Sequence, residues 1–130
     1  MKNQNLYNYI LTIADNSLIL AQRLGELCGH GPSLETDIAL TNIAFLRIER
    51  EYKNCLLVEQ PNTHFGYVIG RQFLFDVYHF MLMEKLQNSK DETLTAIAKK
   101  SIKEVSYHKR FSSDWIKRLG DGTEESNVKM

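Results

Sequence analysis

The chain has 130 residues, of which 43% are hydrophobic and 25% are charged, so it falls among ordinary globular proteins and outside the disordered class. Lysine plus arginine and aspartate plus glutamate each number 16, which excludes the basic excess typical of nucleic-acid-binding proteins. The two cysteines, Cys28 and Cys55, lack the spacings of a zinc site, and no signal-peptide pattern follows Met1. We therefore expect a single cytoplasmic domain with free thiols.

Residues 5–28 are predicted to form the first helix. Apolar side chains recur there at the three- and four-residue steps of one helix face, namely Leu6, Ile10, Ile13, Leu20, Leu24 and Leu27. The Gly-His-Gly-Pro sequence at residues 29–32 should end this helix, because proline cannot continue the hydrogen-bond ladder. Ser33 then fits the N-cap of a second helix over residues 33–50, whose apolar pattern becomes irregular toward its end.

The third helix is predicted over residues 63–88. Residues 56–62 form a connector closed by Pro61, after which Asn62 or Thr63 can cap the helix. Its apolar stretch, residues 73–86, is interrupted by charged and polar side chains and is too short to cross a membrane. We therefore expect no membrane-spanning segment.

The fourth helix is predicted over residues 90–119. Ser89 and Glu92 have the spacing of a capping box, and Gly120 is the natural end of the helix. Both prolines of the chain lie between predicted helices, and no segment shows the alternation of a strand. The sequence therefore predicts an all-α protein.

Polar side chains lie on the faces of the third and fourth helices that should point into the core. Asp76 and His79 share the inner line of the third helix. His108 lies in the apolar stripe of the fourth helix, with Glu104 one turn before it. Burial of such groups costs several kcal/mol unless they pair or bind something.

A di-metal site of the ferritin-like class is one explanation. It takes one Glu from each of two helices and a Glu-x-x-His from each of the other two. Asp76 and His79 have this spacing with Asp in place of Glu, whereas Glu104 and His108 are four residues apart. The first two helices offer only carboxylates that are not clearly on the inner stripe: Asp15, Glu26, Glu35 and Asp37.

The incomplete ligand set favours a second explanation, a vestigial metal site that holds no metal. In this interpretation four side chains form one buried hydrogen-bonded network: Asp76, His79, Glu104 and His108. We assign no catalytic or cofactor-binding residue to the chain.

Six segments spread over nearly the whole chain carry a recognisable pattern: residues 15–26, 28–32, 34–43, 57–62, 71–79 and 102–112. In sequence and order they resemble the C-subunit family of the phenylacetyl-CoA epoxidases. The resemblance implies a ferritin-like antiparallel helical bundle that is a non-catalytic, structural subunit of a multicomponent monooxygenase. In that family a homologous sister subunit holds the di-iron centre and the substrate, and a reductase supplies electrons.

Two departures from the family matter. Family members carry further residues at the position of the Ala44–Phe45 junction, and they continue beyond Met130. We therefore expect a chain that is shortened relative to the family, with a break in chain continuity at Ala44–Phe45.

Two other interpretations stay open. The chain could be a small self-sufficient di-iron oxidoreductase that completes its ligand set with carboxylates from another copy. It could also be a helical bundle that merely dimerises.

Overall fold

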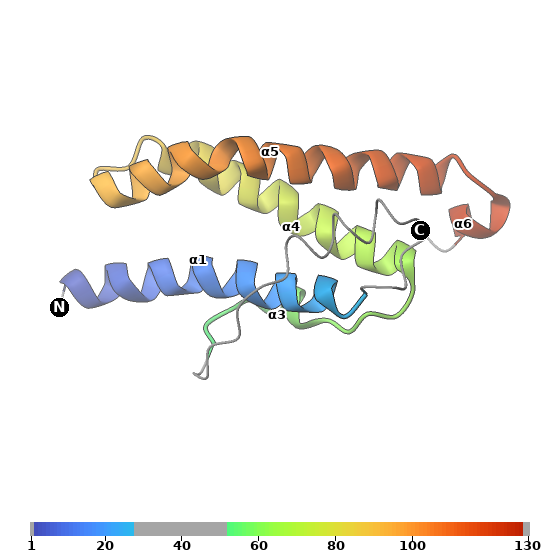
Figure 1. Cartoon of the computed structure of the whole chain (residues 1–130), viewed down its shortest axis with the longest axis horizontal. Helices are drawn as coiled ribbons and strands as arrows, with labels where there is room; N and C mark the ends of the chain where they lie inside the picture. Colours follow the sequence, from blue (N-terminus) through green and yellow to red (C-terminus); the bar gives the residue numbers. More distant parts are fainter. Residues whose placement is uncertain (1, 28–51, 129–130) are drawn as a thin grey trace. The chain divides into compact units, whose positions relative to one another are not determined.

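The structure, a computed structural model, describes residues 2–27 and 52–128, and every regular element in these residues is a helix (Figure 1). The prediction of an all-α protein is therefore confirmed. The second predicted helix, over residues 33–50, and the predicted break at Ala44–Phe45 lie outside the described residues. The chain divides into two compact units, residues 1–63 and 64–130, which are described separately. The expectation of a single domain stays a prediction.

The first unit is built on helix α1 (Lys2–Gly25), which lies within three residues of the predicted bounds. Leu20, Ala21 and Leu24 are buried on it, as the apolar stripe requires. A single helical turn, α3 (Leu56–Glu59), contacts α1 and buries Val58 completely. The predicted connector thus contains a short helix that packs on the first one.

Two buried polar side chains of α1 hold the extended segment before α3. Asp15 accepts a hydrogen bond from the backbone N–H of Lys53 at 2.8 Å, and Asn16 accepts one from that of Cys55 at 2.7 Å. Buried polar groups need such partners, and backbone N–H groups outside a helix need acceptors. The side chains of Asp15 and Asn16 therefore supply the acceptors that the backbone N–H groups of this extended segment need outside regular secondary structure.

The second unit is an antiparallel helix pair, α4 (Phe65–Leu86) and α5 (Glu92–Gly120), followed by the short α6 (Glu124–Val128) (Figure 1). The loop between α4 and α5, residues 87–91, is short enough that the two helices must reverse direction and pack on each other. Their common core consists of Val68, Ile69, Phe75 and Met83 from α4 and Leu94, Ala98 and Val105 from α5.

The start of α4 differs from the prediction. The N-cap is His64, whose Nδ1 accepts a hydrogen bond from the backbone N–H of Tyr67 at 3.1 Å. Asn62 lies two residues before this cap, and its side-chain amide donates to the backbone carbonyl of Arg23, 2.6 Å away on α1. The prediction of Asn62 or Thr63 as the cap is therefore wrong.

The start of α5 differs in the same way. Asp91 is the N-cap and accepts a hydrogen bond from the backbone N–H of Leu94 at 3.0 Å. Ser89 instead accepts from the backbone N–H of Asp91 at 3.1 Å, which closes the turn before the helix. The capping box of Ser89 and Glu92 is therefore wrong, whereas the end of α5 at Gly120 lies one residue beyond the predicted end at residue 119.

Among the described residues, no helix combines the length and the apolar character that a bilayer crossing requires.

Candidate functional site

The buried polar site of the second unit is centred on Asp76 of α4, which is 2% exposed. Its Oδ1 accepts a hydrogen bond from Nε2 of Gln72, one turn earlier, at 2.7 Å. Its Oδ2 accepts one from Oγ of Ser112, on α5, also at 2.7 Å. Both partners are buried as well, so the carboxyl group of Asp76 joins α4 to α5 through a hydrogen bond in their common core.

The hydroxyl group of Ser112 has a choice of acceptors. Its Oγ lies 2.7 Å from Oδ2 of Asp76, 3.1 Å from the carbonyl of His108 and 3.3 Å from the carbonyl of Lys109. A hydroxyl group has one proton to donate but two lone pairs with which it can accept. A protonated Asp76 can donate to Ser112, which then donates to a carbonyl of its own helix, so the neutral acid uses more of these contacts than the carboxylate.

Burial raises the pKa of Asp76 from its ordinary value of 3.8 to about 6, because the ionised form loses its hydration in the core. The hydrogen bonds from Ser112 and Gln72 lower this pKa in part, but they do not offset the loss of hydration. Oε1 of Gln72 is buried and accepts no hydrogen bond from the described residues.

His79 of α4 and His108 of α5 are half-buried near this site. Burial lowers the pKa of both imidazoles, and a positive charge on His108 would lower that of His79 further. The nearby carboxylate of Glu104 partly raises the pKa of His108 again. The ring of His79 lies 5.3 Å from that of Phe75, centre to centre, so the imidazole packs against an aromatic side chain of its own helix.

The predicted buried network is wrong in two respects. It included Asp76, His79, Glu104 and His108, but Glu104 is not buried, and the four side chains are not joined by the expected hydrogen bonds in the described residues. Glu104 is exposed, because its position on α5 is turned away from the face that packs on α4. No hydrogen bond joins the side chains of these four residues to one another in the part of the chain that the structure describes.

Sequence reasoning missed the two residues that do bind Asp76, although a signal for both was present. Gln72 lies one turn before Asp76 on the inner line of α4, and Ser112 lies one turn after His108 on the apolar stripe of α5. A polar residue that can donate on such a line is the expected partner of a buried carboxyl group.

The residues of this site do not fit a di-metal centre. Both oxygens of Asp76 already accept hydrogen bonds from Gln72 and Ser112, and Glu104 points away from the core. Within residues 2–27 and 52–128, no group of three or more His, Cys, Asp or Glu side chains is placed to hold a metal ion. A di-iron site needs at least four carboxylates with two histidines, which this arrangement does not bring together.

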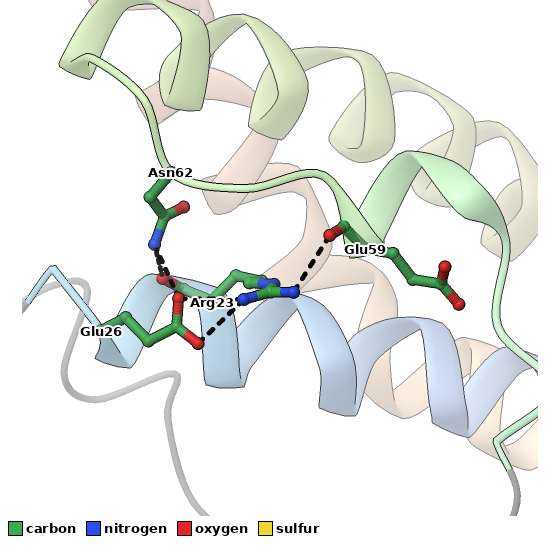
Figure 2. Close-up of polar contacts among 4 residues, drawn as sticks. All are labelled: Arg23, Glu26, Glu59 and Asn62. Atoms are coloured by element: carbon green, nitrogen blue, oxygen red, sulfur yellow. Dashed lines mark hydrogen bonds and ion pairs between the residues drawn. The ribbon is translucent and has the colours of Figure 1, made fainter.

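A second polar cluster lies in the first unit, where α1 ends (Figure 2). The guanidinium of Arg23 contacts the carboxylate of Glu26 at 3.1 Å and donates to the backbone carbonyl of Glu59 at 3.1 Å. The side-chain amide of Asn62 donates to the carbonyl of Arg23 and to the carboxylate of Glu26. These contacts fasten residues 59–62 to the end of α1, so the cluster has a structural role.

Comparison with known proteins identifies the family. The model of the phenylacetic acid catabolic protein family matches residues 1–45 and 43–130. A relative from Escherichia coli (strain K12), named as the C subunit of 1,2-phenylacetyl-CoA epoxidase, is 44% identical over 149 residues, a match that covers 94% of this chain and 60% of that protein. The chain thus spans less than two thirds of the length of this relative.

The two segments matched by the family model meet at residues 43–45, and the alignment with the E. coli protein, at 149 residues, is longer than the chain itself. The shortening at Ala44–Phe45 stays a prediction, because these residues lie outside the described part of the structure. The family match itself extends over the whole sequence. The chain therefore belongs to the phenylacetic acid catabolic protein family, and its helices are those of a ferritin-like fold.

Proposed function

We propose that this chain is a structural, non-catalytic subunit of a phenylacetyl-CoA epoxidase that acts in the aerobic degradation of phenylacetate. The name of the E. coli relative supports the complex, and the description of the family supports the pathway. The observation that carries the structural role is the state of Asp76, whose two oxygens are held by Gln72 and Ser112 rather than directed at an open site.

The reaction in this proposal takes place in a homologous subunit, which holds the di-iron centre and the phenylacetyl-CoA and receives electrons from a reductase. This chain contributes a folded helical surface on which that subunit assembles. We place the complex in the cytoplasm, and we propose neither nucleic acid nor membrane as a partner. The chemistry that iron supplies there is the activation of O₂ for epoxidation of the aromatic ring.

The alternative of a small self-sufficient di-iron oxidoreductase is not favoured. It requires Asp76, His79, Glu104 and His108 to converge on one centre. The exposure of Glu104 and the hydrogen bonds made by Asp76 both oppose this arrangement.

The test is co-expression of this chain with a homologous catalytic subunit, followed by purification of the complex, metal analysis and a phenylacetyl-CoA epoxidation assay. We expect iron in proportion to the catalytic subunit alone and no epoxidation by this chain in isolation. Asp76→Asn and Ser112→Ala should change the activity of the complex only as far as they change its assembly. Asp114→Asn, at an exposed position on α5, is the matched control.

Stoichiometric iron in the isolated chain would contradict the structural role. So would an Asp76→Asn complex that assembles fully but has lost both iron and activity.

A further inference from the structure

The side of α5 that points away from α4 is strongly basic. Helix α5 packs on α4 through one line of buried residues, namely Leu94, Ala98, Val105 and Ser112. On its outer side lie six exposed cations: Lys99, Lys100, Lys103, Arg110, Lys117 and Arg118. The first, third, fourth and fifth of these follow one another at steps of four, seven and seven residues, which the helical period keeps on one line. We call the six residues the basic face of α5.

Acidic residues of the same helix do not balance the basic face. Helix α5 carries seven lysine and arginine residues but only three acidic residues, whereas the whole chain carries equal numbers of the two kinds. The positive charge of α5 is therefore compensated elsewhere in the chain. A protein surface normally mixes both signs of charge, so a face of one sign indicates a role for its electric field.

The cations of the basic face also lie close to one another. Lys103 is four residues from Lys99 and three residues from Lys100, so like charges are neighbours on the helix surface and destabilise it. Glu104 has the spacing to pair with Lys100. In the part of the chain that the structure describes, however, no cation of the basic face lies within ion-pair distance of a carboxylate. An acidic surface brought against α5 would relieve this repulsion.

The surroundings of the basic face favour a protein as its partner. Tyr107, which is 56% exposed, lies between Lys103 and Arg110, and tyrosine is enriched in protein interfaces. Two exposed acidic residues, Glu104 and Asp114, lie beside the cations and would repel the phosphates of a nucleic acid, whereas in a protein interface each can meet a cation. The apolar side of α5 is packed on α4, so it is not available for insertion into a membrane.

The charged character of the face favours a partner that binds reversibly. Subunits that stay assembled meet through extensive apolar contacts, whereas electron-transfer proteins meet through small, transient ones. Exposed charges speed such encounters and make them sensitive to salt. In the proposed function the catalytic subunit stays bound, and the reductase is the component that needs only transient contact.

We propose that the basic face of α5 is a docking site for an acidic surface of the reductase. This proposal rests on the proposed function, in which a reductase supplies electrons to the homologous catalytic subunit. From Lys99 to Lys117 the basic face is about 27 Å long, which is enough to orient a protein along the helix.

The test uses the assembled complex of this chain, the homologous catalytic subunit and the reductase. Epoxidation of phenylacetyl-CoA is measured at increasing reductase concentration, with the parent chain and with the double variant Lys103→Glu and Arg110→Glu. We expect the KM for the reductase to rise about tenfold or more, because two charges that steer the encounter are reversed. The loss should appear in KM rather than in kcat, which separates weakened docking from a defect in the catalytic subunit.

The double variant Lys85→Glu and Lys90→Glu is the matched control, because it changes the net charge equally at two exposed positions outside the basic face. It should leave the KM for the reductase unchanged. Circular dichroism checks that both double variants keep the helix content of the parent. Raising NaCl from about 50 to about 300 mM should raise the KM of the parent complex and have little effect on that of the basic-face variant.

An equal KM for the parent complex and the basic-face variant would overturn the docking site while the proposed function stood. An equal rise in KM for the control would overturn it too, since net charge rather than the basic face would then act. If the basic face binds a short DNA duplex or phosphatidylserine vesicles but not the reductase, the proposal is wrong and the face belongs to that anion. If the parent complex neither assembles nor epoxidises, the proposed function is wrong and the docking site falls with it.

Discussion

Replacement of Asp76 by asparagine should change how the stability of the chain depends on pH. Asparagine keeps the size of the side chain and the acceptor for Ser112, and it removes the ionisable group. Its amide can donate to the buried Oε1 of Gln72 once the side-chain amide of Gln72 turns over, and this oxygen accepts no hydrogen bond from the described residues of the parent. The variant should therefore fold as the parent does, without the free-energy cost of burying an ionised carboxylate.

The size of the effect follows from the pKa of Asp76, which is about 6 in the folded chain against an ordinary value of 3.8. Because the folded pKa is the higher of the two, the favourable contribution of Asp76 is fully present below pH 3.8 and is lost as the pH rises to about 6. At 1.36 kcal/mol per pKa unit, the free energy of unfolding should fall by about 3 kcal/mol across this window. Above it, Asp76→Asn should be more stable than the parent by up to the same amount.

The assay is urea denaturation followed by circular dichroism at several pH values between about 3.5 and 8. The upper limit lies about two pH units above the pKa of Asp76 in the folded chain. Histidine titration affects parent and variant alike, so the difference between the two isolates Asp76. Asp114→Asn, at an exposed position, is the control and should leave the curve of the parent unchanged. If the difference between Asp76→Asn and the parent is the same at every pH, the carboxyl group is not perturbed and the argument fails.

Three further predictions concern other parts of the chain. Glu104→Ala should change the free energy of unfolding by no more than about 0.5 kcal/mol, because the side chain is exposed, and a loss of several kcal/mol in a urea titration would restore the buried network. Asn62→Ala should cost about 1 kcal/mol in the same assay, since it removes the hydrogen bond to the carbonyl of Arg23, whereas the exposed Asn88→Ala should cost nothing measurable. The imidazoles of His79 and His108 should titrate below pH 6.5 in NMR spectra, so the stability that their neutral forms contribute is lost as the pH falls below that value. His108→Gln should raise the pKa of His79, because it removes a nearby positive charge. A titration of His79 at or above pH 6.5 would contradict this prediction.

The sequence predicted the helices because the information for them is local. The three- and four-residue steps of apolar residues placed α1, α4 and α5 within three residues of their observed bounds, and Gly120 marked the end of α5 to within one residue. The caps were less accurate, since a cap depends on the residue at which the chain enters the helix. The helix α4 begins at Phe65, so His64 rather than Asn62 or Thr63 accepts the hydrogen bond of the N-cap.

The sequence also selected the region of the buried polar site, because Asp76 lies on a helix face that must point inward. Gln72 and Ser112 also lie on the predicted inner lines, but the sequence did not show which polar residues of these lines bind Asp76. Only the packing of α5 on α4 brings Ser112 to the carboxyl group and leaves Glu104 in solvent. Which of two neighbouring lines on a helix is buried depends on the rotation of the whole helix against its partner. Tertiary structure therefore decided that Asp76 binds a hydroxyl and an amide rather than a histidine, and with that the physical character of the site.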